Sequence, residues 1–384
     1  MRALRGRSVR PILRLAAAAT LGLALLAGGV RTFAQDATPA AALPVAGHGA
    51  AGRGAAGHGA AGHGAAGHGA AARAKPTPPV LLAQANASAP ARIVTPGIDS
   101  PNPFVLQVGA TYYMYSSQYS IFGPNIPLRS SGVLTSWSSD TDAMPNPPAW
   151  VERGYTWSPD VRRVGDHYVM WFSGALAGRA PLTKCIGVAT SASPRGPFVG
   201  LAAPTICQLD HNGDIDPRTF RTQDGSLWLD WKSDDNADVN GTSHSSIYAQ
   251  RLAANGQALV GAATVILTAD QPWEGRIVEA PQMIEHDGGY WLFYSANWFN
   301  EPYYGIGVAE CQGPAGPCHK YLDRPWLSSN AQGSGPGEAS LFTGATGTWI
   351  LYSPTAVHYR TYTARPVALA RVGFGPFGPY LAAF

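Results

Sequence analysis

Five similar stretches of sequence recur at nearly constant intervals in the last three quarters of the chain. They read VGATYYMYSS from Val108, VGDHYVMWFSG from Val164, DGSLWLDWKS from Asp224, DGGYWLFYSAN from Asp287 and TGTWILYSP from Thr346. When Tyr112, Tyr168, Trp228, Trp291 and Trp349 are aligned, the intervals between them are 56, 60, 63 and 58 residues. Each stretch alternates with period two after a Gly-containing turn, which predicts a strand that follows a hairpin.

Repeated strand units of about sixty residues, with almost no helical pattern, predict an all-β fold: a five-bladed β-propeller with about four strands per blade. A β-sandwich also has short strands and turns, but it does not require five matching stretches at this interval. The chain has 11 Trp, 16 Tyr and 12 Phe, and these aromatic residues are sufficient to fill a sizeable core.

The first 92 residues have a composition that does not support a core. Residues 1–34 contain an Arg-rich start, an apolar run and a small-residue cleavage site at Ala34, which predicts a signal peptide and a secreted protein. An uncleaved membrane anchor is the alternative, although the apolar run is shorter than the roughly 20 residues of a span. We therefore expect no stable membrane insertion after processing.

Residues 35–92 contain a repeated AGHGA unit, with His48, His58, His63 and His68 in register. This segment has no apolar face, so we interpret it as a flexible linker; metal capture by the His residues is the alternative. The predicted propeller domain spans residues 93–384. That part has 17 basic and 23 acidic residues, a net charge of −6, which argues against nucleic acid as a partner.

Four cysteines lie in the predicted propeller, and an even number in an exported chain favours disulfides. Each pair is local in sequence, so we predict the disulfides Cys185–Cys207 and Cys311–Cys318. A metal site is the weaker interpretation because no CxxC spacing is present.

Acidic side chains precede four of the aromatic strands in Pro- or Gly-flanked motifs. They are Asp160 in TWSPD, Asp214 and Asp216 in GDIDPRTF, Glu279 in IVEAPQM and Glu338 in GPGEASLF. Asp160, Asp216, Glu279 and Glu338 precede the aligned aromatic residue by 8, 12, 12 and 11 positions. Equivalent positions of successive blades converge on the propeller axis, so these spacings predict a carboxylate-lined pocket about the size of a sugar.

These motifs resemble glycoside hydrolase family 43, a family of five-bladed propellers that act on arabinose- or xylose-containing polysaccharides. WSPDV, IDPRTF and EAPQM are similar to the family's motifs in blades two, three and four. The resemblance covers residues 93–384. It implies a polysaccharide or oligosaccharide substrate and hydrolysis with inversion of configuration. We expect a monomer that requires no cofactor.

The resemblance implies that Glu279 is the general acid and that Asp216 raises the pKa of Glu279 and orients it. The catalytic base of the family is an Asp before the second Pro of the blade-one motif. This chain has Asp99-Ser100-Pro101-Asn102-Pro103 there, so Asn102 occupies the base position, and an amide does not accept a proton at ordinary pH.

Three alternatives follow for the base. Asp99 swings in as a substitute; Asn102 positions the water as an imidic tautomer or with help from Asp160; or the chain is a weak or inactive hydrolase that only binds glycan. Glu338 stands where many relatives have a His. It adds a carboxylate to the channel, where it is a candidate substrate-binding residue, a candidate ligand for a structural Ca²⁺ and a candidate rearranged base.

Aromatic residues near these motifs suit a sugar pocket, because sugar rings stack on aromatic faces. Trp157 and Trp298 are the candidate substrate-binding residues, with Phe299 and Tyr303 on the same loop as Trp298; a place in the core or at a blade edge is the alternative. Arg218 is expected either to pair with a channel carboxylate or to lie at the surface.

Overall fold

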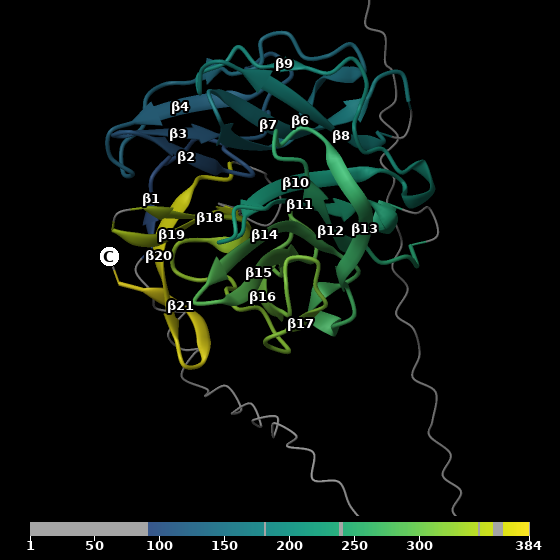
Figure 1. Ribbon diagram of the computed structural model, residues 1–384. Helices are drawn as coiled ribbons and strands as arrows, with labels where there is room; N and C mark the ends of the chain where they lie inside the picture. The colour runs from purple at the N-terminus through teal and green to yellow at the C-terminus, as the bar shows by residue number, and fades with distance from the viewer. Residues whose placement is uncertain (1–90, 180–181, 238–240, 345, 356–363, 384) are drawn as a thin grey trace, which may run out of the picture. The chain divides into compact units, whose positions relative to one another are not determined.

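A computed structural model of the chain describes residues 91–179, 182–237, 241–344, 346–355 and 364–383. Within these residues the chain forms five antiparallel sheets, four with four strands and one with five (Figure 1). The prediction of a five-bladed all-β propeller is confirmed. The predicted signal peptide and nearly all of the predicted linker, with its His repeats, lie outside the described residues.

The strands of each blade follow one another along the chain. Blade one contains β2 (Phe104–Val108), β3 (Thr111–Tyr115), β4 (Pro127–Ser131) and β5 (Thr141–Asp142). Blade two contains β6 (Val151–Val164), β7 (His167–Leu176), β8 (Lys184–Ser191) and β9 (Val199–Gly200). Blade three contains β10 (Asp214–Arg221), β11 (Leu227–Ser233), β12 (Ser246–Leu252) and β13 (Leu259–Thr268). Blade four contains β14 (Val278–His286), β15 (Gly289–Ala296), β16 (Gly305–Cys311) and β17 (Cys318–Lys320).

Blade five joins the two ends of the propeller. It contains β18 (Ser334–Gly344), β19 (Gly347–Thr355) and β20 (Ala368–Gly375), with β1 (Arg92–Ile93) and β21 (Gly378–Ala382) both paired to β20. Figure 1 shows β1 beside these yellow C-terminal strands. Because β1 supplies an outer strand to the last sheet, backbone hydrogen bonds link the start of the propeller to its end.

The five aromatic stretches form the second strand of each blade, namely β3, β7, β11, β15 and β19. The turns before them contain the glycines Gly109, Gly165, Gly225, Gly288 and Gly347, all with positive φ. Glycine adopts this backbone conformation without a Cβ clash, which explains why each stretch begins with a Gly-containing turn.

The core consists of five apolar clusters, and each cluster joins two neighbouring blades. Successive residues of a strand point to opposite faces, so each second strand contributes to two clusters. Leu292 packs towards blade three, whereas Phe293 packs towards blade five. A strand that is buried on both faces needs apolar residues at almost every position, which is why the repeated stretches are so rich in aromatic residues.

Both predicted disulfides, Cys185–Cys207 and Cys311–Cys318, are present. Cys311 and Cys318 face each other on β16 and β17, so this bond closes one hairpin. Cys185 lies on β8, and its partner Cys207 lies just before the short 3-10 helix η1 (Leu209–His211). That segment leads from blade two into β10, so this bond anchors the connection between two blades.

Two further 3-10 helices, η2 (Asp235–Ala237) and η3 (Pro272–Glu274), lie in connections of the described chain. No helix in the described part is long and apolar enough to cross a membrane.

Candidate active site

The innermost strands β2, β6, β10, β14 and β18 lie in contact around the ring, each with the next. Within four of these strands, and just before β2 in blade one, one residue adopts a left-handed backbone conformation. These residues are Asn102, Ser158, Asp216, Ala280 and Glu338, with φ of 48°, 51°, 61°, 45° and 58°. Non-glycine residues rarely adopt this conformation, and a fivefold repetition at equivalent positions indicates a shared structural requirement.

The left-handed residue begins a two-residue irregularity in the strand pairing of four blades. In β10, for example, the register shifts between Ile215 and Arg218, and in β14 it shifts between Glu279 and Gln282. Bulges of this kind redirect side chains. Here they bring polar side chains from several blades to one cavity.

The cavity has a volume of about 290 Å³. Its lining contains the acids Asp216, Asp234, Glu279 and Glu338, the cations Lys184, Lys232 and Arg365, the amides Asn102 and Asn236, the aromatic residues Trp157, Trp298 and Phe299, and the aliphatic residues Ile215 and Ile277. Charged groups opposite aromatic rings are typical of a site that binds a small polar ligand.

Six of the eight residues that the sequence singled out line this cavity: Asn102, Trp157, Asp216, Glu279, Trp298 and Glu338. Trp157 is half-buried on β6, and Trp298 is 46% exposed on the loop after β15. Asp99 and Asp160 do not line the cavity.

Asp160 lies on β6 but is completely buried, and its carboxylate accepts a hydrogen bond from the Thr219 hydroxyl. The alignment of acids placed Asp160 opposite Asp216, but the left-handed conformation shows that the counterpart of Asp216 is Ser158. The side chain of Asp160 therefore lies two positions along the strand from Ser158, the residue whose hydroxyl contacts Asp216.

Asp99 lies in the segment before β2, where its Oδ1 accepts the backbone N–H of Arg365 at 2.9 Å. The Arg365 Nε lies 3.5 Å from the same oxygen. This carboxylate therefore holds the segment that carries Arg365, and it is Arg365 that lines the cavity.

Glu279 lies at the wall of the cavity, where its side chain is 15% exposed, and it has two polar neighbours. The Tyr304 hydroxyl donates to its Oε1 at 2.7 Å, and Lys232 Nζ lies 3.2 Å from its Oε2. Burial raises the pKa of Glu279; Lys232 opposes this effect, and the charge of Asp216 adds to it. A carboxyl in this environment retains its proton to a higher pH than an exposed one.

Asp216 is held by two donors from neighbouring blades. The Ser158 hydroxyl donates to Oδ1, and the Ala280 N–H donates to Oδ2 at 3.1 Å. Ala280 follows Glu279 directly in sequence, so Asp216 fixes the backbone that carries the Glu279 side chain.

Serines at the ends of the second strands satisfy the N–H groups of the left-handed residues in the next blade. Ser173 accepts the Asp216 N–H at 3.0 Å, and Ser295 accepts the Glu338 N–H at 2.8 Å. Ser117 accepts the Ser158 N–H at 2.9 Å. These serines lie at or near the end of the repeated stretches of sequence. The repeat therefore indicated these hydrogen bonds between neighbouring blades, which the acidic residues alone did not reveal.

Glu338 connects blade five to blade one. Its Oε2 accepts the Asn102 N–H at 2.7 Å, and its Oε1 accepts from Arg365 Nη1 at 2.8 Å. Arg365 therefore balances the charge of this carboxylate, and the Ca²⁺ site predicted at Glu338 stays a prediction. The described residues contain no group of three or more His, Cys, Asp or Glu side chains placed to hold a metal ion.

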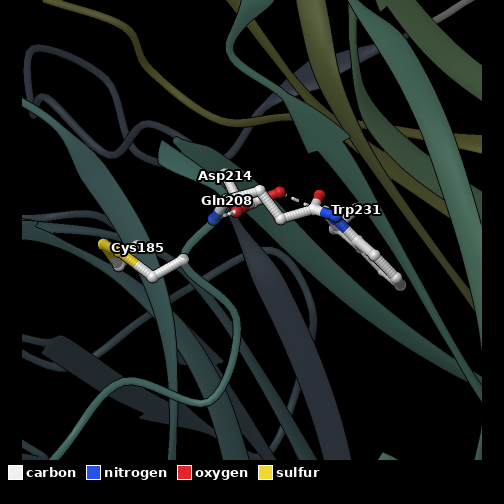
Figure 2. The surroundings of a disulfide bond; sticks show 5 residues. Cys185, Gln208, Asp214 and Trp231 are labelled. Atoms are coloured by element: carbon white, nitrogen blue, oxygen red, sulfur yellow. Dashed lines mark hydrogen bonds between the residues drawn. A yellow bond between two sulfur atoms is a disulfide. The ribbon is translucent and has the colours of Figure 1, made fainter. Parts of the chain in front are cut away.

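Asp214 begins β10 but does not reach the cavity. Figure 2 shows its carboxylate between Gln208 and Trp231, near Cys185; it accepts the Gln208 N–H at 2.6 Å and Trp231 Nε1 at 3.0 Å. Burial raises its pKa to about 6. Asp214 therefore anchors the disulfide-linked connection between blades two and three.

Sequence reasoning missed the cations of the cavity and Tyr304. Lys232 is buried on β11, and Asp234 lies between it and Lys184, at 3.1 and 2.5 Å. A lysine directly after Trp231 in the predicted strand of DGSLWLDWKS was the available signal for Lys232. Tyr304 and Arg365 lie in irregular segments, where no spacing pointed to them.

Arg218 was expected either to pair with a carboxylate or to lie at the surface. The structure buries it, with Nη1 at 3.4 Å from the Pro159 carbonyl oxygen and its guanidinium over the Phe104 ring. Burial lowers its pKa, and the nearby charges of Asp160 and Asp216 oppose that effect. Its position inside the ring excludes the surface alternative.

Comparison with known proteins agrees with this geometry. The model of Glycosyl hydrolases family 43 matches residues 93–378. A solved structure of a thermostable family-43 glycoside hydrolase superposes with a TM-score of 0.67 at 26% identity, and the match covers 76% of this chain and 96% of that one.

Two curated proteins are similar over parts of their length. An extracellular endo-alpha-(1->5)-L-arabinanase 2 of Bacillus subtilis (strain 168) is 22% identical over 148 residues, which are 33% of this chain and 31% of the relative. A beta-D-galactofuranosidase of Aspergillus niger is 26% identical over 247 residues, which are 60% of this chain and 66% of the relative. The chain thus spans less than two thirds of each of these relatives.

Proposed function

Because the chain belongs to Glycosyl hydrolases family 43, a family of O-glycosyl hydrolases, we propose that it is an exported, monomeric enzyme that hydrolyses glycosidic bonds in glycans containing arabinose, xylose or galactofuranose. The arabinose and galactofuranose substrates are those named for its two curated relatives. The two disulfides and the extracellular relative support export. A cavity of about 290 Å³ has the size of a pocket for one sugar unit.

The observation that carries this proposal is the environment of Glu279. The carboxyl lies in the cavity wall, largely withdrawn from solvent and beside the charge of Asp216. Desolvation and that charge both raise the pKa of Glu279. A carboxylic acid that stays protonated near neutral pH protonates the leaving oxygen as the glycosidic bond breaks. We therefore assign Glu279 as the general acid.

We assign Asp216 as the positioning residue for that acid. Its Oδ2 holds the Ala280 N–H at 3.1 Å, which fixes the strand next to Glu279, and its charge disfavours ionisation of Glu279. Trp157 and Trp298 at the cavity wall provide faces on which a sugar ring stacks.

A second function, glycan binding without turnover, is favoured by one observation. Asn102 lines the cavity at the position of the family's base, and an amide does not take up the proton of an attacking water. A chain with no replacement base would bind its sugar and release no product.

One assay separates the two functions. The purified chain is incubated with arabinan, arabinoxylan and the aryl glycosides of α-L-arabinofuranose, β-D-xylose and β-D-galactofuranose, and sugar release is measured beside glycan binding. We expect release by the wild type and a loss of about 10²–10⁴-fold in Glu279→Gln.

The matched control is Glu285→Gln on the same strand, β14, where the carboxylate accepts the Gln223 N–H outside the cavity. This variant should keep wild-type activity. Glycan binding without any sugar release by the wild type would support the binding function and contradict the enzyme.

A further inference from the structure

We infer that Glu338 is the general base of this enzyme, so that the base has moved from blade one to blade five. This inference rests on the proposed function, because it names the group that activates water in the same cavity. Two changes in the sequence then explain each other: an amide, Asn102, stands at the usual base position, and a carboxylate, Glu338, stands beside it.

The two residues are in direct contact across the join between blades five and one. The Glu338 Oε2 accepts the Asn102 N–H at 2.7 Å, and both residues line the cavity. Both occupy the left-handed position of their blades. A base supplied by Glu338 therefore comes from the blade next to the usual one, and from the equivalent position in that blade.

The other acids near the cavity have different places or partners. Asp99 and Asp160 do not line the cavity. Asp234 lies between Lys184 and Lys232, at 2.5 and 3.1 Å, and Asp216 receives the two hydrogen bonds that hold Ala280 and Ser158. Among the described acids that line the cavity, Glu338 is the one in direct contact with the residue at the usual base position.

The surroundings of Asn102 favour its ordinary amide form. Ser117 Oγ accepts the Ser158 N–H, so its own hydrogen is available for donation to Asn102 Oδ1, which lies 2.7 Å away. The oxygen of Asn102 thus serves as an acceptor. The amide NH₂ group that remains is a donor and orients a water molecule or a sugar hydroxyl without removing its proton.

Two contacts of Glu338 favour the ionised form that a base requires. Arg365 Nη1 lies 2.8 Å from Oε1, and this cation and the Asn102 N–H favour the ionised form. Burial raises the pKa of Glu338 against these two effects, and the charges of Asp216 and Asp99 add to the rise. Each carboxylate oxygen has two acceptor sites, so one remains on each oxygen for water.

The reaction balances with these two carboxyl groups. Glu338 takes one proton from the water as its oxygen bonds to the anomeric carbon. The bond from that carbon to the leaving oxygen breaks, and Glu279 gives its proton to that oxygen. One proton has then moved from Glu279 to Glu338, and exchange with solvent restores both groups.

The test uses the full chain and an aryl glycoside that the wild type cleaves. Glu338→Gln should lower kcat by about 10²–10⁴-fold. Adding Asn102→Asp to the Glu338→Gln variant should raise kcat again by about tenfold or more. Glu338→Ala should regain turnover when azide is added and should release a glycosyl azide of inverted configuration, because azide attacks without a base.

These readouts separate a base from a structural residue. Gln keeps an acceptor for the Asn102 N–H, so Glu338→Gln should stay largely active if Glu338 has only a structural role. In that case Glu338→Ala should also form no glycosyl azide. An active Glu338→Gln variant beside an inactive Glu279→Gln variant would overturn the base assignment and leave the proposed function intact. If the wild type shows no turnover but the Asn102→Asp variant is active, both the base assignment and the proposed function are overturned.

Discussion

Lys232 is the cation closest to the proposed acid. It lies on β11, almost fully buried, with its Nζ 3.1 Å from Asp234 and 3.2 Å from Glu279. Its positive charge lowers the pKa of Glu279, against the raising effects of burial and of Asp216. Lys232 therefore limits how far the pKa of the acid rises, and this limit sets the pH range in which Glu279 is protonated.

Replacing Lys232 by Met should extend activity to higher pH. Without the ammonium, the pKa of Glu279 should rise further, and the alkaline limb of kcat/KM against pH should move up by about 1–3 pH units. The groups that face Glu279 are Lys232, Asp216 and Tyr304, and only the first of these changes. A pH–rate profile of the variant measures the shift.

Lys320→Met is the matched control. Lys320 is also a buried lysine paired with two acids, Asp270 and Glu274, but it lies on β17 outside the cavity. Both variants should lose stability, because each leaves carboxylates without their cation. An alkaline limb that moves equally in both variants would contradict the role of Lys232.

At the scale of elements, the serines that end the second strands hold one blade to the next. The N–H groups of the left-handed residues are turned away from normal strand pairing, and a buried N–H without an acceptor costs about 1–3 kcal/mol. Ser173 and Ser295 provide these acceptors for Asp216 and Glu338. The geometry of the site thus depends on residues that never contact substrate.

Ser173→Ala should lower the free energy of unfolding by about 1–3 kcal/mol, measured by urea denaturation. Ser353→Ala is the control at the equivalent position of blade five. The Ser353 hydroxyl only donates, to the Ser100 carbonyl at 3.4 Å, so its removal should cost less. Equal losses of unfolding free energy in the two variants would show that the hydrogen bond from Ser173 to the N–H of the next blade contributes no more to stability than the Ser353 contact does.

The two disulfides should differ in their contribution to stability. Cys185 and Cys207 are 22 residues apart, and Cys311 and Cys318 are 7 apart. The longer loop loses more conformational entropy when it is closed in the unfolded chain, by about 1 kcal/mol in the loop-entropy model. The Cys185→Ser/Cys207→Ser variant should therefore unfold at lower urea concentration than Cys311→Ser/Cys318→Ser. The reverse order would contradict this model here.

For the whole molecule, buried carboxyl groups should make the protein more stable in mild acid than at neutral pH. Burial raises the pKa of Asp214 to about 6, and it also raises the pKa values of Asp230, Glu279 and Glu338. Between about pH 4 and pH 6 the native state then binds more protons than the unfolded chain. The stability that these four groups contribute is therefore fully present below this window and is lost as the pH rises through it.

Asp214 alone should contribute a fall of about 3 kcal/mol across that window, which corresponds to a shift of about two pKa units. Unfolding by urea at pH 4.5, 6 and 7.5 measures the effect, and Asp214→Asn should flatten the pH dependence. Asp224→Asn is the control, because the pKa of Asp224 is lowered and its window lies below pH 4. Constant stability from pH 4.5 to 7.5 would contradict the prediction.

The sequence by itself determined the architecture and half of the residues that line the site. A strand buried between two neighbouring blades needs apolar side chains on both faces, so the five aromatic stretches revealed the blades and their number. The motifs around Asn102, Asp216, Glu279 and Glu338 marked the four polar residues that meet at the axis, and local spacing sufficed for both disulfides.

Only the tertiary structure decided which acid reaches the cavity and which partner it has. Asp160 and Ser158 differ by two positions on one strand. A bulge with left-handed backbone, which the spacing of acids does not reveal, places Ser158 and not Asp160 in contact with Asp216. Arg365 meets Glu338 across 27 residues of sequence, and Glu338 meets Asn102 across 236. Such contacts depend on closure of the ring, which brings together residues whose sequence separation carries no local pattern.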